Sequence, residues 1–130
     1  MRKLKSAFVG VDQGSVHLFS DYDTDGPMWS RTGDREVAKR IMFSEPFARP
    51  PAVTVQIAML DSHSDHFLRM SYDATDVTCE GFTLVFKTWS DTRLAQVKMS
   101  WQAIGELPQD DDWLAVSQDP DHWALTDCVY

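Results

Sequence analysis

The strongest constraint on the fold is an alternation of apolar and polar residues on both sides of a short polar turn. Between Gly81 and Gly105 the sequence reads GFTLVFKTWSDTRLAQVKMSWQAIG. Every second residue before and after TWSDTR is apolar, which is the pattern of two β-strands that each bury one face. The turn leaves Trp89 beside Ser90 and Asp91. An aromatic face covers the apolar C–H patch of a sugar ring and small polar groups bind its hydroxyls, so the turn is a candidate sugar-binding edge.

The same period of two recurs along the chain, whereas helical periodicity is almost absent. Alternating segments occupy residues 53–59, 68–72, 82–86 and 95–103. A fifth contains Val37, Ile41 and Phe43, with Lys39 as a discordant residue of the same parity, and a sixth lies in either 7–11 or 16–19. Glycine and proline turn signals separate these segments. The pattern predicts an all-β fold, a small six-stranded antiparallel β-sandwich.

A length of 130 residues fits one domain. We expect the sandwich to occupy residues 1–105 and an irregular, acidic tail to occupy 106–130. Because a fully solvated segment rarely carries two tryptophans, Trp113 and Trp123 predict that the tail packs on the domain or on a neighbouring subunit. Disorder of the tail is the alternative.

The charge balance limits the classes of partner. Twelve basic and twenty acidic residues give a net charge of −8, which disfavours nucleic acid and anionic membranes. No apolar run is long enough to insert in a membrane, and the run at 7–11 is too short for a signal peptide. We therefore expect a cytoplasmic location, with leaderless release or display on a particle as alternatives. Cys79 and Cys128 are expected to be reduced, although their spacing does not decide whether they form a bridge.

No motif of an activated nucleophile, a phosphate loop or a dinucleotide site occurs, so we expect no enzymatic activity and no cofactor. Asp21, Asp23 and Asp25 resemble the start of a calcium loop. The glutamate that completes such a loop at its twelfth position is replaced by Thr32. We therefore expect no calcium site.

A second polar cluster, at residues 61–66, contains two histidines and two aspartates. Histidine and carboxylate side chains can bind zinc, but between two predicted strands this segment is more simply a hairpin loop, so we expect no metal site. His63 or His66 can instead approach the sugar or a subunit boundary and make it sensitive to pH.

Several short motifs occur in an order that resembles the H-type lectin family, the fold of the snail agglutinins. They are Arg35-Glu36, FSEPF at 43–47, RPPAV at 49–53, Leu60-Asp61, Arg69, Gly81-Phe82, Thr88-Trp89 with Thr92, and Ser100-Trp101. The resemblance covers about residues 35–104. It implies a six-stranded antiparallel sandwich, assembly into trimers or pairs of trimers, and calcium-independent binding of galactose or N-acetylgalactosamine near subunit boundaries.

The resemblance also implies individual site residues. Arg69 matches the family's hydroxyl-binding arginine, and Trp89 matches its stacking aromatic. Ser90 stands where the snail lectin has a histidine, which removes an imidazole donor, and Ala95 replaces a tyrosine, which would open the pocket. The family's cysteine positions are also unmatched here, which fits a reducing compartment.

The carboxylate that grips a sugar hydroxyl in the family has two candidate positions here. Direct spacing from the Arg35-Glu36 pair gives Thr32, whereas Asp34 is two residues away and supplies a carboxylate, so we favour Asp34. The predicted carbohydrate-binding residues are therefore Asp34, Arg69, Trp89, Ser90 and Asp91.

Two tryptophans receive different assignments. Trp101 shares its parity with Val97 and Met99, which predicts a core position. Trp89 follows a strand end, where the residue pattern alone also allows a structural aromatic, and the resemblance favours a binding role. By pattern alone Arg69 is a solvated charge.

These observations predict a lectin with weak single sites that are repeated by self-association into a trimer or hexamer, since linked sites gain avidity. The alternative is a structural or adaptor subunit of a surface or virus-like particle that keeps the fold for assembly. Ser90 and Ala95, which alter the expected pocket, favour that alternative.

Overall fold

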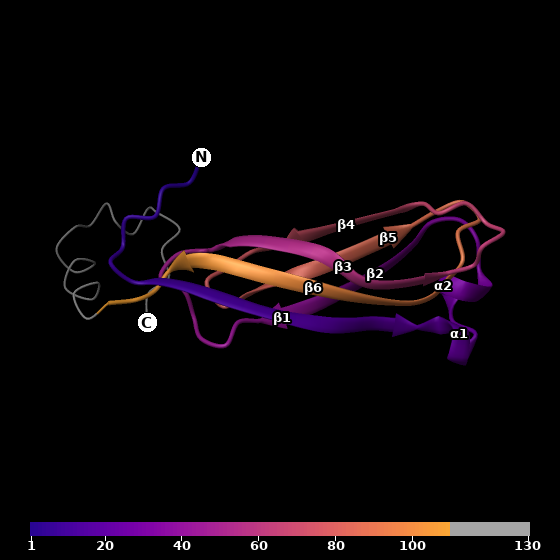
Figure 1. The fold of residues 1–130 in the computed structure, drawn as a ribbon, viewed down its shortest axis with the longest axis horizontal. Helices are drawn as coiled ribbons and strands as arrows, with labels where there is room; N and C mark the ends of the chain where they lie inside the picture. Colours follow the sequence, from indigo (N-terminus) through magenta and orange to yellow (C-terminus); the bar gives the residue numbers. More distant parts are fainter. Residues whose placement is uncertain (110–130) are drawn as a thin grey trace.

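The computed structural model describes residues 1–109, which form two three-stranded antiparallel sheets packed face to face (Figure 1). One sheet has the order β1-β6-β3, and the other has the order β2-β5-β4. The strands are β1 (Val9–Ser20), β2 (Arg35–Met42), β3 (Ala52–Ser62), β4 (Met70–Thr75), β5 (Gly81–Thr88) and β6 (Leu94–Glu106). Two short helices, α1 (Asp21–Thr24) and α2 (Pro27–Ser30), follow β1. The predicted six-stranded antiparallel sandwich is confirmed.

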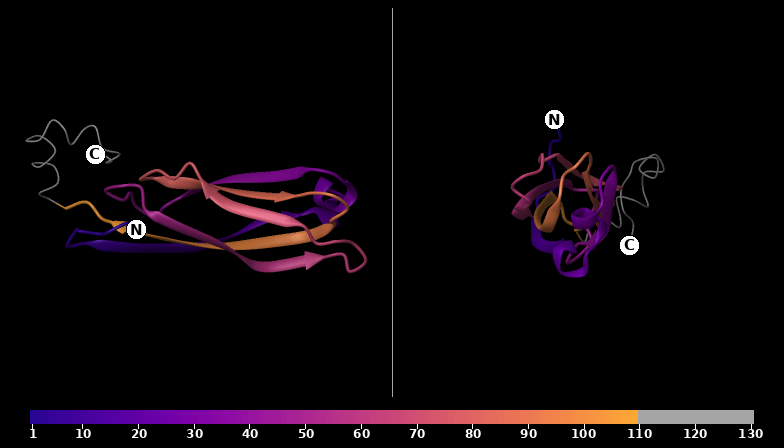
Figure 2. Two further views of the ribbon diagram at one scale, coloured as in Figure 1. Left: turned by 90° about the horizontal axis from the view of Figure 1, so that it is seen from above. Right: turned by 90° about the vertical axis from the view of Figure 1, so that its right-hand side faces the viewer.

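The strands run along the long axis of the molecule, so the sandwich has two distinct ends (Figure 2). The N-terminal segment lies at one end, and α1, α2 and the turn between β5 and β6 lie at the other (Figure 1). Among the described residues, no helix is long and apolar enough to cross a membrane.

The core lies between the sheets and is built from the predicted alternation. Phe82, Leu84 and Phe86 of β5 are fully buried. The alternating apolar residues predicted for β6, within 95–103, are buried as well. Trp101 packs against Phe82 at a ring-centroid distance of 5.5 Å, which confirms its core assignment. Because alternate residues of each strand enter this layer, the other face of each sheet is left to polar and small side chains.

Strand β1 contains one of the two segments that were alternatives for the sixth strand, 16–19, in full and the last three residues of the other, 9–11. Its central residues lack large apolar side chains because the ring of Trp101 occupies the space beneath them. A Cβ atom added to Gly14 would lie 2.9 Å from Cζ2 of Trp101. The glycine therefore marks a close approach inside one continuous strand.

Both edge strands of the first sheet are bulged at the same level. The register between β1 and β6 shifts between His17 and Phe19, and that between β3 and β6 shifts between Ile57 and Met59. His17 and Met59 both pair with Lys98. Beyond the bulge in β3, Leu60 is the residue that packs against the core. A bulge shifts the alternation in this way because it adds one residue to one strand only.

The prediction for β4 was wrong at its start. Leu68 was expected to alternate with Met70 and Tyr72, but β4 begins at Met70, and Leu68 is 49% exposed in the preceding loop. The Thr92 hydroxyl accepts a hydrogen bond from the main-chain N–H of Arg69, so this segment is held by a side chain in place of the strand ladder.

The expectation of reduced thiols was wrong for Cys79. This residue is fully buried and disulfide-bonded. Sequence separation carries no information on spatial proximity, so the cysteine count did not predict this bond. A disulfide at Cys79 removes the support that reduced cysteines would give to a reducing compartment. Cys128 and the tail tryptophans Trp113 and Trp123 lie outside the described residues.

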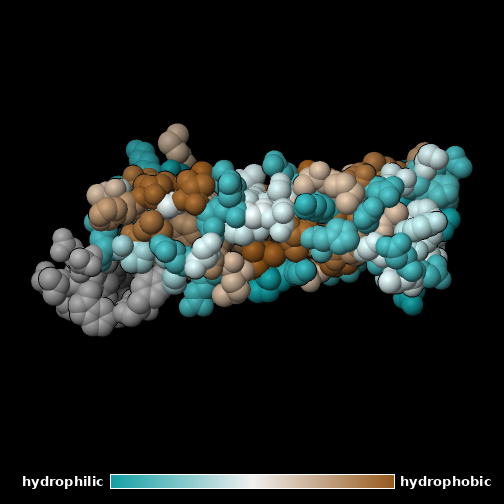
Figure 3. All heavy atoms as spheres, turned by 60° about the horizontal axis from the view of Figure 1, so that its bottom comes forward, coloured by the Kyte–Doolittle hydropathy of each residue, from teal (hydrophilic) through white to brown (hydrophobic). Residues whose placement is uncertain are grey.

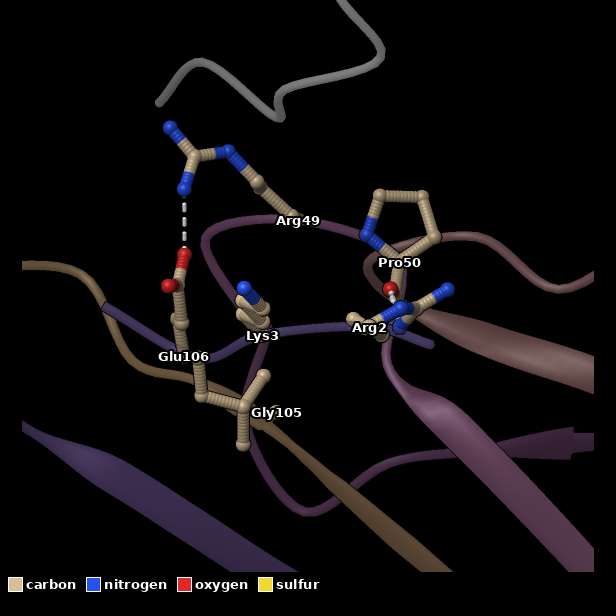
Figure 4. A pocket seen from close by; sticks show the side chains of 7 residues that line it. Arg2, Lys3, Arg49, Pro50, Gly105 and Glu106 are labelled. Atoms are coloured by element: carbon tan, nitrogen blue, oxygen red, sulfur yellow. Dashed lines mark hydrogen bonds and ion pairs between the residues drawn. The ribbon is translucent and has the colours of Figure 1, made fainter. Parts of the chain in front are cut away.

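At the N-terminal end, Glu106 organises the chain. Its carboxylate accepts hydrogen bonds from the main-chain N–H groups of Lys5 (2.7 Å) and Ser6 (3.2 Å) and forms an ion pair with Arg49 (Figure 4). Burial alone would raise the pKa of Glu106, but these donors and the charge of Arg49 outweigh it, and the pKa lies below the usual range. A hollow of about 180 Å³ beside this carboxylate is lined partly by Arg2.

We predict that Trp101→Ala destabilises the protein by about 3–5 kcal/mol, because it leaves a cavity between the sheets. Equilibrium unfolding in urea measures this change. Phe8→Ala is the matched control, since Phe8 is 58% exposed and its removal leaves no cavity. Equal stability of the two variants would contradict the core assignment.

Candidate functional site

Asp34 and Trp89 lie directly opposite each other, just before β2 begins and just after β5 ends. The register of these strands pairs Arg35 with Thr88. It continues in the hydrogen bond from the Gly33 N–H to the Ser90 carbonyl, at 2.8 Å. Asp34 and Trp89 occupy the position between these two pairs. The antiparallel pairing therefore continues for two rows beyond the Arg35–Thr88 pair, at which β2 begins and β5 ends.

Arg69 occupies the same row on the other side of Trp89. The register of β4 with β5 pairs Met70 with Thr88, so the preceding residue, Arg69, faces Trp89. Neighbouring strands of a sheet are about 4.8 Å apart. The three predicted residues Asp34, Trp89 and Arg69 thus form one row across the sheet, which we call the terminal row.

The side chains of the terminal row point away from the core. In the adjacent row, Arg35 and Thr88 are buried, and successive residues of a strand face opposite sides. In agreement, Asp34 and Arg69 are exposed and Trp89 is 37% exposed. A partly open indole is therefore presented to solvent between the segments that carry Asp34 and Arg69, and the Arg69 guanidinium lies over the ring of Phe67, 5.5 Å from its centroid.

The register distinguishes the two candidate carboxylate positions. Thr32 precedes Gly33, whose N–H contacts the Ser90 carbonyl, and so lies beyond the row that contains Trp89. Asp34 is the residue beside Trp89. The direct sequence spacing that favoured Thr32 counts residues along one strand, whereas proximity to Trp89 depends on the pairing of two strands.

Two buried threonines fix the main chain of Arg69, and sequence reasoning did not assign them this role. The Thr88 hydroxyl donates to the Arg69 carbonyl at 2.5 Å. The Thr92 hydroxyl accepts from the Arg69 N–H at 2.9 Å and donates to the Phe67 carbonyl at 2.6 Å. The signal for Thr88 was available, because it continues the buried parity of Phe86. Thr92 was noted only as part of the family motif with Thr88 and Trp89.

Arg35 is a further positioning residue, which the sequence analysis noted only as part of a family motif. It is 8% exposed. Its guanidinium donates to the carbonyls of Gly33 (2.8 Å), Thr92 (2.8 Å) and Ser90 (3.2 Å), and more weakly to those of Pro27 and Met28 in α2. Burial lowers the pKa of Arg35, and the nearby charge of Asp34 partly offsets this effect.

The turn itself is shaped by Ser90, whose φ of 61° lies in the left-handed region. The Ser90 carbonyl is used by Gly33 and Arg35, while its side chain is exposed. One carboxylate oxygen of Asp91, Oδ1, is buried without a hydrogen-bond partner. Such an atom is costly to leave unpaired.

The other predicted acidic and histidine clusters have different roles. The Asp21 carboxylate accepts the Met28 N–H at 2.9 Å and so holds α2, and its neighbour Asp23 accepts the Ser20 hydroxyl. Within residues 1–109, no three histidine, cysteine or acidic side chains gather in a geometry that would hold a metal ion. Ala95 is buried on the core side of β6.

Comparison with known proteins identifies the family. Residues 38–104, more than half of the chain, match the H-type lectin domain. A protein of Fuscovulum blasticum named ATP synthase subunits region ORF 7 is 49% identical over 107 residues, which are 82% of this chain and 93% of that protein. Discoidin-2 of Dictyostelium discoideum is 26% identical over 81 residues, which are 62% of this chain and 32% of discoidin-2.

The solved structure of wild-type discoidin II from Dictyostelium discoideum has the same fold. It superposes with a TM-score of 0.67 at 23% identity over 80% of this chain and 40% of the discoidin chain. This chain thus spans about two fifths of discoidin II. From the match to the domain and the shared sandwich, the chain belongs to the H-type lectin domain family.

Proposed function

We propose that the protein is a non-catalytic lectin that binds glycans at the terminal row, with Ser90 and Asp91 completing the site. The observation that carries the proposal is the alignment of Asp34, Trp89 and Arg69 by the strand register. These residues are 20 to 55 positions apart in the sequence, and three separate segments bring them together on an exposed face.

The chemistry of the row suits a sugar ring. The indole of Trp89 offers an apolar face that can cover the C–H patch of a pyranose. On its two sides the row offers an acceptor, Asp34, and the fork of donors of Arg69, which together can bind adjacent hydroxyls. Because the main chain of Arg69 is held by Thr88 and Thr92, little ordering entropy is lost there on binding.

The sugars that we propose are galactose and N-acetylgalactosamine, the types that the family resemblance implies. Ser90, with its exposed hydroxyl, would make a shorter contact than the histidine of the snail lectin. A single site of this kind buries little surface, so its affinity should be weak and useful binding should come from linked copies.

We further propose that a trimer or hexamer forms through the outer face of the β1-β6-β3 sheet. Three successive rows of this face carry no charge, although the chain has a net charge of −8. Charged residues are depleted at the centres of protein interfaces. In the view of Figure 3, which shows the β1 side, the largest hydrophobic area lies towards the N-terminal end. The uncharged rows are Val11–Ile104–Ala52, Gln13–Gln102–Thr54 and Ser15–Ser100–Gln56.

A structural or adaptor subunit is the second candidate, and the replacement of the family's histidine by Ser90 favours it. The two functions predict different outcomes in assays of glycan binding and assembly. A lectin binds glycans and assembles, whereas a structural subunit assembles without binding any glycan.

Glycan-array binding followed by titration tests the lectin function. We predict that Trp89→Ala abolishes binding without unfolding the protein, because the side chain is partly exposed and stacks on the ligand. Arg69→Lys should weaken binding substantially, since an ammonium cannot reproduce the guanidinium fork. Phe8→Ala, an exposed aromatic at the opposite end, is the control and should bind like the wild type.

Unfolding of Trp89→Ala would return this residue to a structural role, and unchanged affinity of Arg69→Lys would remove Arg69 from the site. The pair Asp34→Asn and Thr32→Val tests the register. Asp34→Asn should weaken glycan binding more than Thr32→Val does. A larger loss of affinity in Thr32→Val would contradict the placement of Asp34 in the terminal row.

The threonine that holds Arg69 gives a separate prediction. Thr92→Val should weaken glycan binding and destabilise the fold by about 1–3 kcal/mol, because it leaves the Arg69 N–H and the Phe67 carbonyl without their partner. Thr92→Ser retains the hydroxyl and should restore binding. Titration and urea unfolding measure the two effects, and equal binding by the valine and serine variants would show that the hydroxyl does not position Arg69.

For the assembly, we predict a trimer or hexamer at micromolar concentration in light scattering, unchanged by a reducing agent. Ser100→Arg places a charge at the centre of the uncharged face and should dissociate it. Ala38→Arg, at an exposed position on the outer face of the other sheet, is the matched control and should assemble normally. A mass near that of one chain, 14.8 kDa, at all concentrations would rule out the assembly.

A further inference from the structure

We propose that His63 and His66 form a pH-dependent clasp on the loop that carries Arg69, so that acidification weakens glycan binding. The inference rests on the proposed function and concerns the regulation of the same site. The loop comprises residues 63–69, between β3 and β4.

The geometry fixes which histidine accepts a hydrogen bond. The Nδ1 atoms of His63 and His66 are 2.9 Å apart, and the main-chain N–H of Asp65 donates to Nδ1 of His63 at 3.1 Å. A main-chain N–H is always a donor, so Nδ1 of His63 is unprotonated. Nδ1 of His66 must then carry the hydrogen that lies between the two rings. The clasp therefore requires a neutral His63, and it tolerates a proton on the far nitrogen of His66.

A proton on Nδ1 of His63 would break both contacts, because it turns the acceptor of two hydrogen bonds into a donor. The surroundings add to this effect. Trp29 of α2 contacts the ring of His63 at 5.6 Å between centroids and also carries the guanidinium of Arg93, which lies 4.4 Å from the indole centroid. A charged His63 would place a second cation beside the same indole.

The acidic and other titratable groups nearby do not neutralise that cation. Asp65 belongs to the loop itself, and Asp61 at the end of β3 accepts from Gln96 of β6 at 3.5 Å. Tyr22 of α1 packs against Trp29, which in turn contacts the ring of His63. Among residues 1–109, no carboxylate forms an ion pair with either histidine.

The clasp is coupled to the terminal row through the loop main chain. The N–H of His63 donates to the Arg93 carbonyl at 2.9 Å, and three residues beyond His66 the Arg69 N–H donates to Thr92. The loop is thus held by the clasp in its first half and by Thr92 in its second half. Loss of the clasp frees the segment that leads directly into Arg69. Binding should be strongest when His63 is neutral and should fall as pH decreases through the range in which histidines titrate.

The test compares glycan affinity at about pH 7.5 and about pH 5.0, a range that spans histidine titration. The wild type should lose about tenfold in affinity, which corresponds to the loss of about one net hydrogen bond. His63→Asn puts an amide oxygen, which accepts but does not titrate, near the place of Nδ1, and its affinity should change by less than about twofold. His17→Asn, an exposed histidine of β1, is the control and should keep the wild-type pH dependence.

A second measurement needs no glycan. In NMR spectra, the Asp65 and Arg69 amide signals should shift between the two pH values in the wild type and in His17→Asn, but not in His63→Asn. If no variant binds any glycan, the proposed function fails while these amides still decide the clasp. The same pH response in the wild type and His63→Asn would overturn the inference.

A further variant guards against misfolding of His63→Asn. His66→Ala removes the donor and should show, already at neutral pH, the weakened affinity and shifted Asp65 amide of the acidified wild type. A wild-type Asp65 signal in His66→Ala would show that the contact between the two rings does not hold the loop.

Discussion

The binding end of the sandwich depends on one buried cation. Arg35 enters the protein from the first position of β2 and donates to main-chain carbonyls of Gly33, Ser90, Thr92 and α2. Some of them, such as the Ser90 carbonyl, also accept a main-chain N–H, but burying main-chain carbonyls without enough donors would be unfavourable. A guanidinium satisfies several at once because its five donors diverge in a plane. The desolvation that lowers the pKa of Arg35 is the energetic cost of this arrangement.

The candidate site is a continuation of the fold. The last buried row of the β2-β5-β4 sheet contains Arg35, Thr88 and Met70, and the next row, facing the other way, contains the residues that we assign to the sugar. A register error of one residue in β5 would exchange the faces of Thr88 and Trp89. The threonine hydroxyls and the pairing of Gly33 with Ser90 therefore serve the site by fixing the register.

Sequence periodicity predicted the sheets well because burial of alternate residues is a local property. Phe82, Leu84 and Phe86 could be assigned to the core without knowing their partners, and even Lys39, on the buried parity of β2, is exposed as its charge requires. Features that depend on distant partners were missed. The disulfide of Cys79 could not be predicted, because the spacing of cysteines along the chain does not show whether they lie close together in space.

The same limit applies to the site. Trp89, Ser90 and Asp91 were evident as a polar turn, and Arg69 and Asp34 were chosen through family resemblance. Their alignment in one row follows from pairing between three segments, which no single-strand pattern contains. The two helices after β1 were also not predicted, since each is one turn long and is fixed by contacts such as that of Asp21 with Met28.

The paired bulges beside Lys98 also limit how such molecules can aggregate. An exposed, regular edge strand is a template for another strand, and repeated edge pairing leads to fibrils. In the β1-β6-β3 sheet both edges are interrupted at the same level, so neither β1 nor β3 presents an unbroken ladder to a neighbour. Continuous edge-to-edge growth through β1 or β3 is thereby disfavoured, and contact through its face is left as the favoured route by which this sheet can associate.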